Sequence, residues 1–99
     1  MKRIFISQPM RDKTDEEINE VRAKAIEHAK EIFGEDCEII DSFFINAPHE
    51  AAPLWFLSQS LKLLSGADAA YFADGWKDYR GCRIENVCAH EYGINVIHE

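Results

Sequence analysis

The chain has 99 residues, which suits one small domain with a single core. Its formal net charge of −7 argues against non-specific binding to a nucleic-acid polymer or an anionic membrane, because both need a basic face. The sequence contains no long apolar segment and no signal peptide. We therefore expect one domain over residues 1–99, located in the cytoplasm.

The first part of the chain predicts a strand followed by a helix. Residues 2–7 form a β-type run, and Pro9 cannot extend an interior strand. Thr14 and Glu17 have the spacing of a capping box, so a helix is expected to begin there and to end at Gly34. Its predicted apolar face consists of Ile18, Val21, Ala25, Ala29 and Ile32.

The middle of the chain repeats this alternation. Residues 37–41 predict a second strand, and residues 42–46 either extend it or lead into a loop. Pro53 suits the first turn of a second helix, which carries leucines at helical spacing and closes at residues 65–66. Residues 69–73 are apolar and flanked by Gly and Asp, as expected for a buried third strand.

The last part of the chain predicts a polar loop, a third helix and a fourth strand over residues 94–97. If the helix begins near Gly81, Glu85 lies within about one turn of its N-terminus, where the partial positive charge favours an ionised carboxylate. Such a carboxylate, near the acid Asp74, could act as a nucleophile or general base; the alternative is ordinary complementation of the helix dipole. The predicted apolar stripe of this helix consists of Ile84, Val87, Cys88 and Tyr92, with Gly93 ending the run.

This alternation predicts an α/β domain in which helices cover both faces of a parallel sheet. We expect a three-layer flavodoxin-like (Rossmann-like) fold, β-α-β-α-β-α-β, with strand order 2-1-3-4. Ligands of such sheets bind beyond the carboxyl ends of the strands, where the strand order reverses. The loops Ser7–Arg11 and Asp74–Arg83 should meet at that point.

Three cysteines, Cys37, Cys82 and Cys88, are odd in number and lack metal-type spacing. We interpret them as reduced structural thiols. No pair of histidines has the i, i+4 spacing of a helical metal site. The sequence therefore predicts neither a metal nor another cofactor.

Three segments carry a resemblance to a known family: residues 6–11 (Ile-Ser-Gln-Pro-Met-Arg), residues 53–55 (Pro-Leu-Trp) and residues 80–85 (Arg-Gly-Cys-Arg-Ile-Glu). With them, nearly the whole chain resembles a small, largely uncharacterised bacterial and phage family of the nucleoside 2-deoxyribosyltransferase-like superfamily. The link to the characterised enzymes rests on the β-α order and on a Gly-x-x-x-Glu pattern, matched here by Gly81 and Glu85.

The resemblance implies cleavage of an N-glycosidic bond, or (deoxy)ribosyl transfer, on a nucleoside or nucleotide. Glu85 would be the nucleophile that forms a glycosyl-enzyme intermediate, and Asp74 would orient the sugar or serve the leaving base. Phe5 stands near the place where these enzymes often keep a tyrosine, and Tyr79 where transferases often keep a second acid. The chain is also shorter than the characterised enzymes.

Other residues of the two loops are candidates for substrate binding. Ser7 and the backbone around Gln8 could bind sugar hydroxyls, and guanidinium groups could hold a 5′-phosphate. Aromatic rings in the second loop could stack on a base. The predicted binding residues are Ser7, Gln8, Pro9, Met10, Arg11, Trp76, Tyr79, Gly81 and Arg83.

The sequence also leaves two alternative functions open and predicts a second copy of the chain as a partner. A catalytically weak or inactive module that binds or sequesters a nucleotide would need the same pocket without a competent nucleophile. An FMN-binding electron carrier shares the fold class only, and the first loop lacks a run of hydroxyl residues suited to a flavin phosphate. A homodimer is expected, because residues 54–56 (Leu-Trp-Phe) supply more apolar surface than one face of a short helix needs.

Overall fold

The computed structural model describes residues 1–41 and 52–99. Its four strands are β1 (Arg3–Ser7), β2 (Glu38–Ile39), β3 (Ala69–Phe72) and β4 (Asn95–His98). They form one parallel sheet in the order β2-β1-β3-β4, which confirms the predicted topology. The predicted extension of the second strand, or loop, over residues 42–46 lies outside the described residues.

The described ranges contain three α-helices, α1 (Asp15–Phe33), α2 (Pro53–Leu64) and α3 (Arg80–Glu91), and a short 3₁₀ helix, η1 (Trp76–Asp78), precedes α3. The predicted capping box is present: the Glu17 N–H donates to Thr14 Oγ1, and the Thr14 N–H donates to Glu17 Oε1, both at 3.1 Å. Gly34 follows α1 with φ +104°, a conformation that favours glycine. Sequence signals thus place the ends of this helix.

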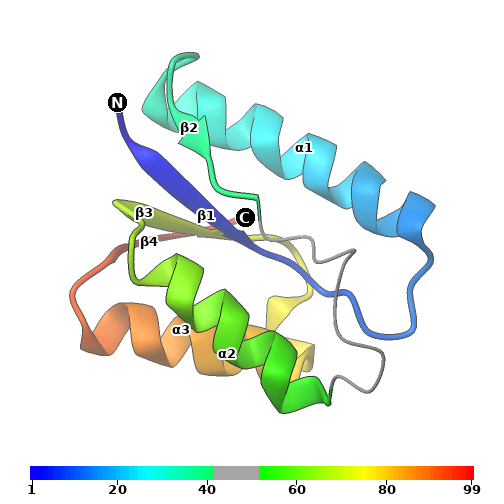
Figure 1. The fold of residues 1–99 in the computed structure, drawn as a ribbon. Helices are drawn as coiled ribbons and strands as arrows, with labels where there is room; N and C mark the ends of the chain where they lie inside the picture. The colour runs from blue at the N-terminus through cyan, green and yellow to red at the C-terminus, as the bar shows by residue number, and fades with distance from the viewer. Residues whose placement is uncertain (42–51) are drawn as a thin grey trace.

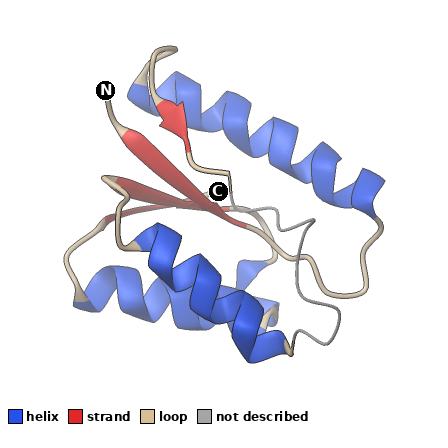
Figure 2. Cartoon of the chain, in the orientation of Figure 1, coloured by secondary structure: helices blue, strands red, loops and turns tan. Residues whose placement is uncertain are grey.

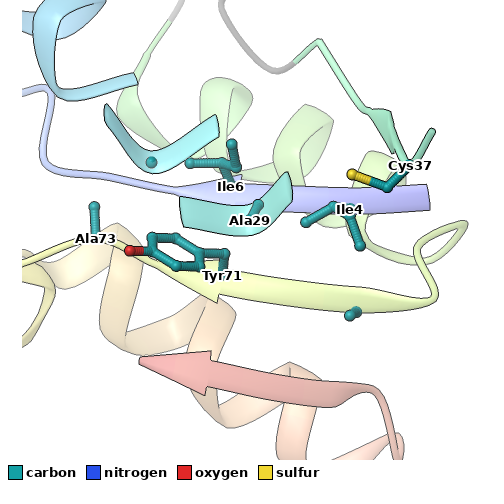
Figure 3. Close-up of a cluster of buried hydrophobic side chains, with 8 residues drawn as sticks. Ile4, Ile6, Ala29, Cys37, Tyr71 and Ala73 are labelled. Carbon is teal, nitrogen blue, oxygen red and sulfur yellow. The ribbon is translucent and has the colours of Figure 1, made fainter. Parts of the chain in front are cut away.

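Helix α1 covers one face of the sheet, whereas α2 and α3 lie side by side on the other (Figures 1 and 2). Successive strand residues point to opposite faces. Ile4, Ile6 and Tyr71 therefore pack toward the small side chains of α1 (Figure 3), whereas Phe5 and Phe72 pack toward α2 and α3.

One residue of the predicted apolar face of α1 is placed differently. Ile18, Ala25 and Ala29 are buried, but Ile32 is 53% exposed. Phe33, four residues after Ala29, packs against the core instead. The inward stripe thus ends on Phe33 and turns Ile32 outward.

The apolar residues whose spacing predicts α3 do not form its buried face. Ile84, Val87 and Tyr92 are exposed, and Cys88 is half-buried. The buried face of α3 consists of Cys82, Glu85, Asn86 and Ala89. A largely polar face therefore packs toward the sheet, and the apolar side chains lie outside.

Within residues 1–41 and 52–99, no helix has the length and apolar character needed to cross a membrane.

Candidate functional site

The β1–α1 loop and the β3–α3 loop meet at the carboxyl edge of the sheet. Ser7 ends β1 and pairs with Phe72 of β3, and the Ala73 N–H donates to the Ser7 carbonyl at 2.9 Å. Beyond the strands, Pro9 Cγ lies 3.6 Å from where a Cβ on Gly75 would be. The Lys13 Nζ lies 6.0 Å from the centre of the Tyr79 ring. The two loops thus lie side by side where the strand order reverses.

The centre of this edge is a buried pair formed by Ser7 and Glu85. The Ser7 hydroxyl donates a hydrogen bond of 2.6 Å to Glu85 Oε1, across 78 residues of sequence. Ser7 is only 2% exposed and Glu85 8% exposed. Strand alternation places Ser7 on the same face as Phe5, facing the helix layer that carries Glu85. The sheet and α3 therefore bring the serine and the glutamate together.

The electrostatics of Glu85 differ from the sequence prediction. Burial raises the pKa of the Glu85 carboxyl above its usual range, and hydrogen bonds from Ser7 and Ser60 oppose this shift. The first turn of α3 contains no acidic residue, and Glu85 follows Arg80, the first residue of α3, by five positions. The helix dipole acts mainly within the terminal turn. Desolvation is therefore the larger influence on the pKa of Glu85, and it acts against the stabilisation of the ionised form that the sequence predicts from the helix N-terminus.

Cys82, which is buried, and Ser60, which is half-buried, lie beside this pair, although sequence reasoning gave neither a role in the site. Burial raises the pKa of the Cys82 thiol to about 11, and a hydrogen bond with Ser7 opposes the shift. At neutral pH this thiol is protonated and is a poor nucleophile. Cys82 precedes Glu85 by three residues, so helical spacing could have placed both on one face. No signal in the sequence of α2 distinguishes Ser60 from Ser58.

Asp74 occupies different surroundings from Glu85. It follows β3, is exposed, and its backbone N–H donates to Glu99 Oε2 at 3.3 Å. It lines an open hollow of about 370 Å³ together with residues of η1 and the end of β4, whereas Ser7 and Glu85 are not among the lining residues. The structure therefore joins Ser7 to Glu85 in a buried pair and leaves Asp74 on the exposed rim of the same sheet edge.

A polar network on the α1 face holds the position of Asp74. The Tyr71 hydroxyl donates to Glu99 Oε1 at 3.0 Å and lies 2.9 Å from His28 Nδ1. Burial, then the hydrogen bond with Glu99, raises the pKa of Tyr71, which keeps the hydroxyl protonated. Because the other oxygen of Glu99 accepts the Asp74 N–H, this network links the rim of the site to α1.

The aromatic candidates are already engaged within the chain. The Trp76 ring stacks on His98, with ring centres 4.9 Å apart and planes 9° from parallel, and also packs at a tilt against Phe72. His98 Nε2 is 2.9 Å from Asn86 Nδ2, an amide donor on the buried face of α3. Burial lowers the pKa of His98, so the neutral ring that accepts this hydrogen bond is favoured. One face of Trp76 is therefore taken up by His98.

Gln8, Pro9 and Met10 shape the first loop more than they line its surface. Gln8 and Pro9 are buried and Met10 is half-buried. The Gln8 Nε2 donates to the Ile18 carbonyl at 2.9 Å, which ties the loop to α1. Among the described residues, Gln8 Oε1 has no hydrogen-bond partner.

The remaining candidates lie at the surface or partly open to it. Arg11 is exposed, with its Nε 3.9 Å from Asp12 Oδ2. Arg83 is exposed, and its Nη1 donates to the Lys77 carbonyl at 2.9 Å. Gly81 is half-buried and has open space where a side chain would begin. The two guanidinium groups could turn toward an anionic ligand at this edge.

Within residues 1–41 and 52–99, no group of three or more His, Cys, Asp or Glu side chains is arranged to hold a metal ion. The chemistry at this edge is that of a buried carboxyl group, the hydroxyl and thiol groups of Ser7, Ser60 and Cys82 beside it, and exposed arginines at the rim. Comparison with protein-family models, with characterised proteins and with solved structures finds no match for this chain.

Proposed function

We propose that this protein cleaves the N-glycosidic bond of a nucleoside or nucleotide, with Glu85 as the nucleophile and water or a second base as the acceptor. The observation that supports this most is the 2.6 Å hydrogen bond between Ser7 and Glu85 at the carboxyl edge of the sheet. A retaining glycosidase uses such a positioned carboxylate to attack the anomeric carbon. The resemblance to the nucleoside 2-deoxyribosyltransferase-like superfamily assigns the same role to this glutamate.

In the proposed reaction, a Glu85 oxygen bonds to C1′ of the sugar while the bond from C1′ to the base nitrogen breaks. The electron pair of the broken bond goes to the base, which takes a proton from water. A water molecule then attacks C1′, loses a proton, and releases the Glu85 carboxylate and the free sugar. If a second base attacks instead of water, the product is a new nucleoside.

Ser7 acts in this reaction as a positioning residue. Its hydroxyl fixes the orientation of the Glu85 carboxyl and favours the ionised form that attacks. Asp74 at the exposed rim orients the sugar, and Arg11 or Arg83 holds a 5′-phosphate where one is present. The reaction takes place in the cytoplasm, in keeping with three cysteines that are free.

Incubation with a panel of nucleosides and 5′-nucleotides, with free base measured by chromatography, tests the proposal. The wild type should release base from at least one member, and Glu85→Gln should lose this release by about 10³-fold or more, as expected for loss of a nucleophile. The matched control Glu27→Gln makes the same change on an exposed face of α1 and should keep full release.

Ser7→Ala tests the role of the hydroxyl through pH. Because the Ser7 hydrogen bond lowers the pKa of Glu85, its removal raises that pKa further. Base release requires the ionised carboxylate, so the rise of the rate with pH should move to higher pH in Ser7→Ala. An unchanged pH profile in Ser7→Ala would contradict the positioning role.

A nucleotide-binding module without catalysis is the second candidate. The observation in its favour is the burial of Glu85, because desolvation raises the pKa of this carboxyl and so disfavours the ionised form that would attack. This candidate predicts saturable binding of a nucleotide by calorimetry, with no base released by the wild type or by Glu85→Gln.

A further inference from the structure

The outer face of α3 carries apolar side chains that the fold leaves uncovered. Ile84 is 36% exposed and Val87 is 58% exposed, although the helix buries a glutamate on its other side. Both lie on a stripe that runs along the helix surface at spacings of four, three and four residues. The members of this outer stripe are Arg80, Ile84, Val87 and Glu91.

The outer stripe is symmetric in spacing and complementary in charge about its own centre. Its midpoint falls between Ile84 and Val87, with a cation at one end and an acid at the other. A two-fold axis through this midpoint would place a second, antiparallel copy of α3 against the first. Arg80 of each copy would then face Glu91 of the other, and Ile84 would face Val87. A self-complementary patch of this kind is what a two-fold interface requires.

Within the part of the chain that the structure describes, the charges at the ends of the outer stripe form no ion pairs. Within the described residues, neither Arg80 nor Glu91 takes part in an ion pair, and both are exposed. Helix pairing in the opposite direction, with α3 parallel to its copy, would bring Arg80 close to Arg80 and Glu91 close to Glu91. The charge pattern therefore favours the antiparallel arrangement over the parallel one.

The neighbouring helix supplies further apolar area in the same layer. Helix α2 packs beside α3, and its Leu54 is 72% exposed. A helix of 12 residues is only about 18 Å long, so α3 alone buries less than the roughly 1,200 Å² of a stable interface. The exposed side chains of α2 extend the area available to a partner. The interface leaves Glu85 on the opposite, inner side of α3.

We propose that this protein forms a two-fold homodimer in which α3 packs antiparallel against α3 of the second copy. The pairs that define the interface are Arg80 with Glu91 of the second copy, and Ile84 with Val87 of the second copy. This dimer does not depend on the proposed glycosidic chemistry, because its residues are separate from Ser7, Glu85 and Asp74.

Charge reversal tests the arrangement directly, with sedimentation analysis at about 0.15 M salt, where charges farther apart than roughly 8 Å are largely screened. The wild type should be a dimer at micromolar concentration. Arg80→Glu and Glu91→Arg should each weaken the dimer by about tenfold or more, because each replaces two attractive pairs by two repulsive ones. The double variant R80E/E91R should recover the dimer.

Mixing the two single variants gives the sharpest result. An Arg80→Glu chain and a Glu91→Arg chain complement each other at both ends of the outer stripe, so an equimolar mixture should form heterodimers although each alone is weakened. The matched controls Lys24→Glu and Glu27→Arg reverse exposed charges on α1 and should leave the dimer intact. Circular dichroism verifies that each variant is folded.

Three results would overturn the proposal. A monomeric wild type at micromolar concentration would leave the outer stripe to a different partner. A dimer that is unaffected by Val87→Glu and by both charge reversals would use another surface. A weakened dimer that neither the double variant nor the mixture restores would contradict the antiparallel pairing.

Discussion

At the scale of single residues, the Ser7 hydroxyl is the central group of the candidate site. The sequence resemblance expects a tyrosine hydroxyl near Phe5, and Phe5 has none. Ser7 lies two residues later on the same face of β1, and its hydroxyl reaches Glu85 at 2.6 Å. Strand alternation therefore places the Ser7 hydroxyl against Glu85, and in the proposed function this hydroxyl takes the place of the tyrosine hydroxyl that Phe5 lacks.

The buried Glu85 should make stability depend on pH. Its pKa in the folded chain lies above the ordinary value of 4.5, so the folded state holds this proton more tightly than the unfolded state. At pH values below the ordinary pKa, the carboxyl is protonated in both the folded and the unfolded state, so its burial carries no penalty in the free energy of unfolding. As pH rises from there through the folded pKa, the penalty grows to about 1.4 kcal/mol for each unit of difference between the two pKa values.

Glu85→Gln removes this penalty and keeps an oxygen that can accept from Ser7. We expect the variant to gain stability relative to the wild type as pH rises from 4.5 to 8, measured by urea unfolding at several pH values. Glu27→Gln on the exposed face of α1 serves as the matched control. A constant difference between Glu85→Gln and the wild type over this pH range would contradict the burial cost.

At the scale of elements, α3 shows where pattern reading fails and why. The helical spacing of Ile84 and Val87 correctly predicts the helix, but apolar residues at such spacing usually face inward and these two do not. The structure instead buries Glu85 and Asn86, which find Ser7 and His98 as hydrogen-bond partners. Those partners come from β1 and β4, so no window of sequence around α3 could reveal them. The buried polar face of α3 is therefore the feature that distinguishes this candidate site.

Two glycines near the site offer a matched test of backbone conformation. Gly75, in the β3–α3 loop, has φ +86°, which side chains rarely adopt, whereas Gly81 lies within α3 with open space around it. Gly75→Ala should destabilise the fold by about 1 kcal/mol or more. Gly81→Ala should stabilise it by up to about 1 kcal/mol, because alanine is a better helix former. Thermal unfolding compares the two, and equal effects would contradict this placement.

At the scale of the whole molecule, the alternation of strands and helices and the residues that end these elements carried most of the information about the fold. Pro9, Thr14, Gly34 and Pro53 mark element ends through backbone rules that act locally, and the right-handed crossover rule leaves few sheet orders. The order β2-β1-β3-β4 then brings the two predicted loops together.

The site was only partly predictable because its chemistry depends on contacts between elements. The meeting of residues 7–11 with residues 74–83 follows from topology, and the sequence singled out Glu85 and Ser7 separately. Their hydrogen bond, the burial that raises the pKa of Glu85, and the approach of Ser60 arise from packing between β1, α2 and α3. The placement of Asp74 beside Glu99 depends on β4.

The central claim is that Glu85 forms a covalent bond to the sugar, and trapping that bond tests it most directly. A nucleoside analogue with fluorine at C2′ slows breakdown of a glycosyl-enzyme, because fluorine disfavours the oxocarbenium-like transition state. After incubation with such an analogue of a nucleoside that the wild type cleaves, mass spectrometry should find one added sugar on the Glu85 side chain, and none on Glu85→Gln. An adduct on another residue, or base release by the wild type that persists in Glu85→Gln, would contradict the account.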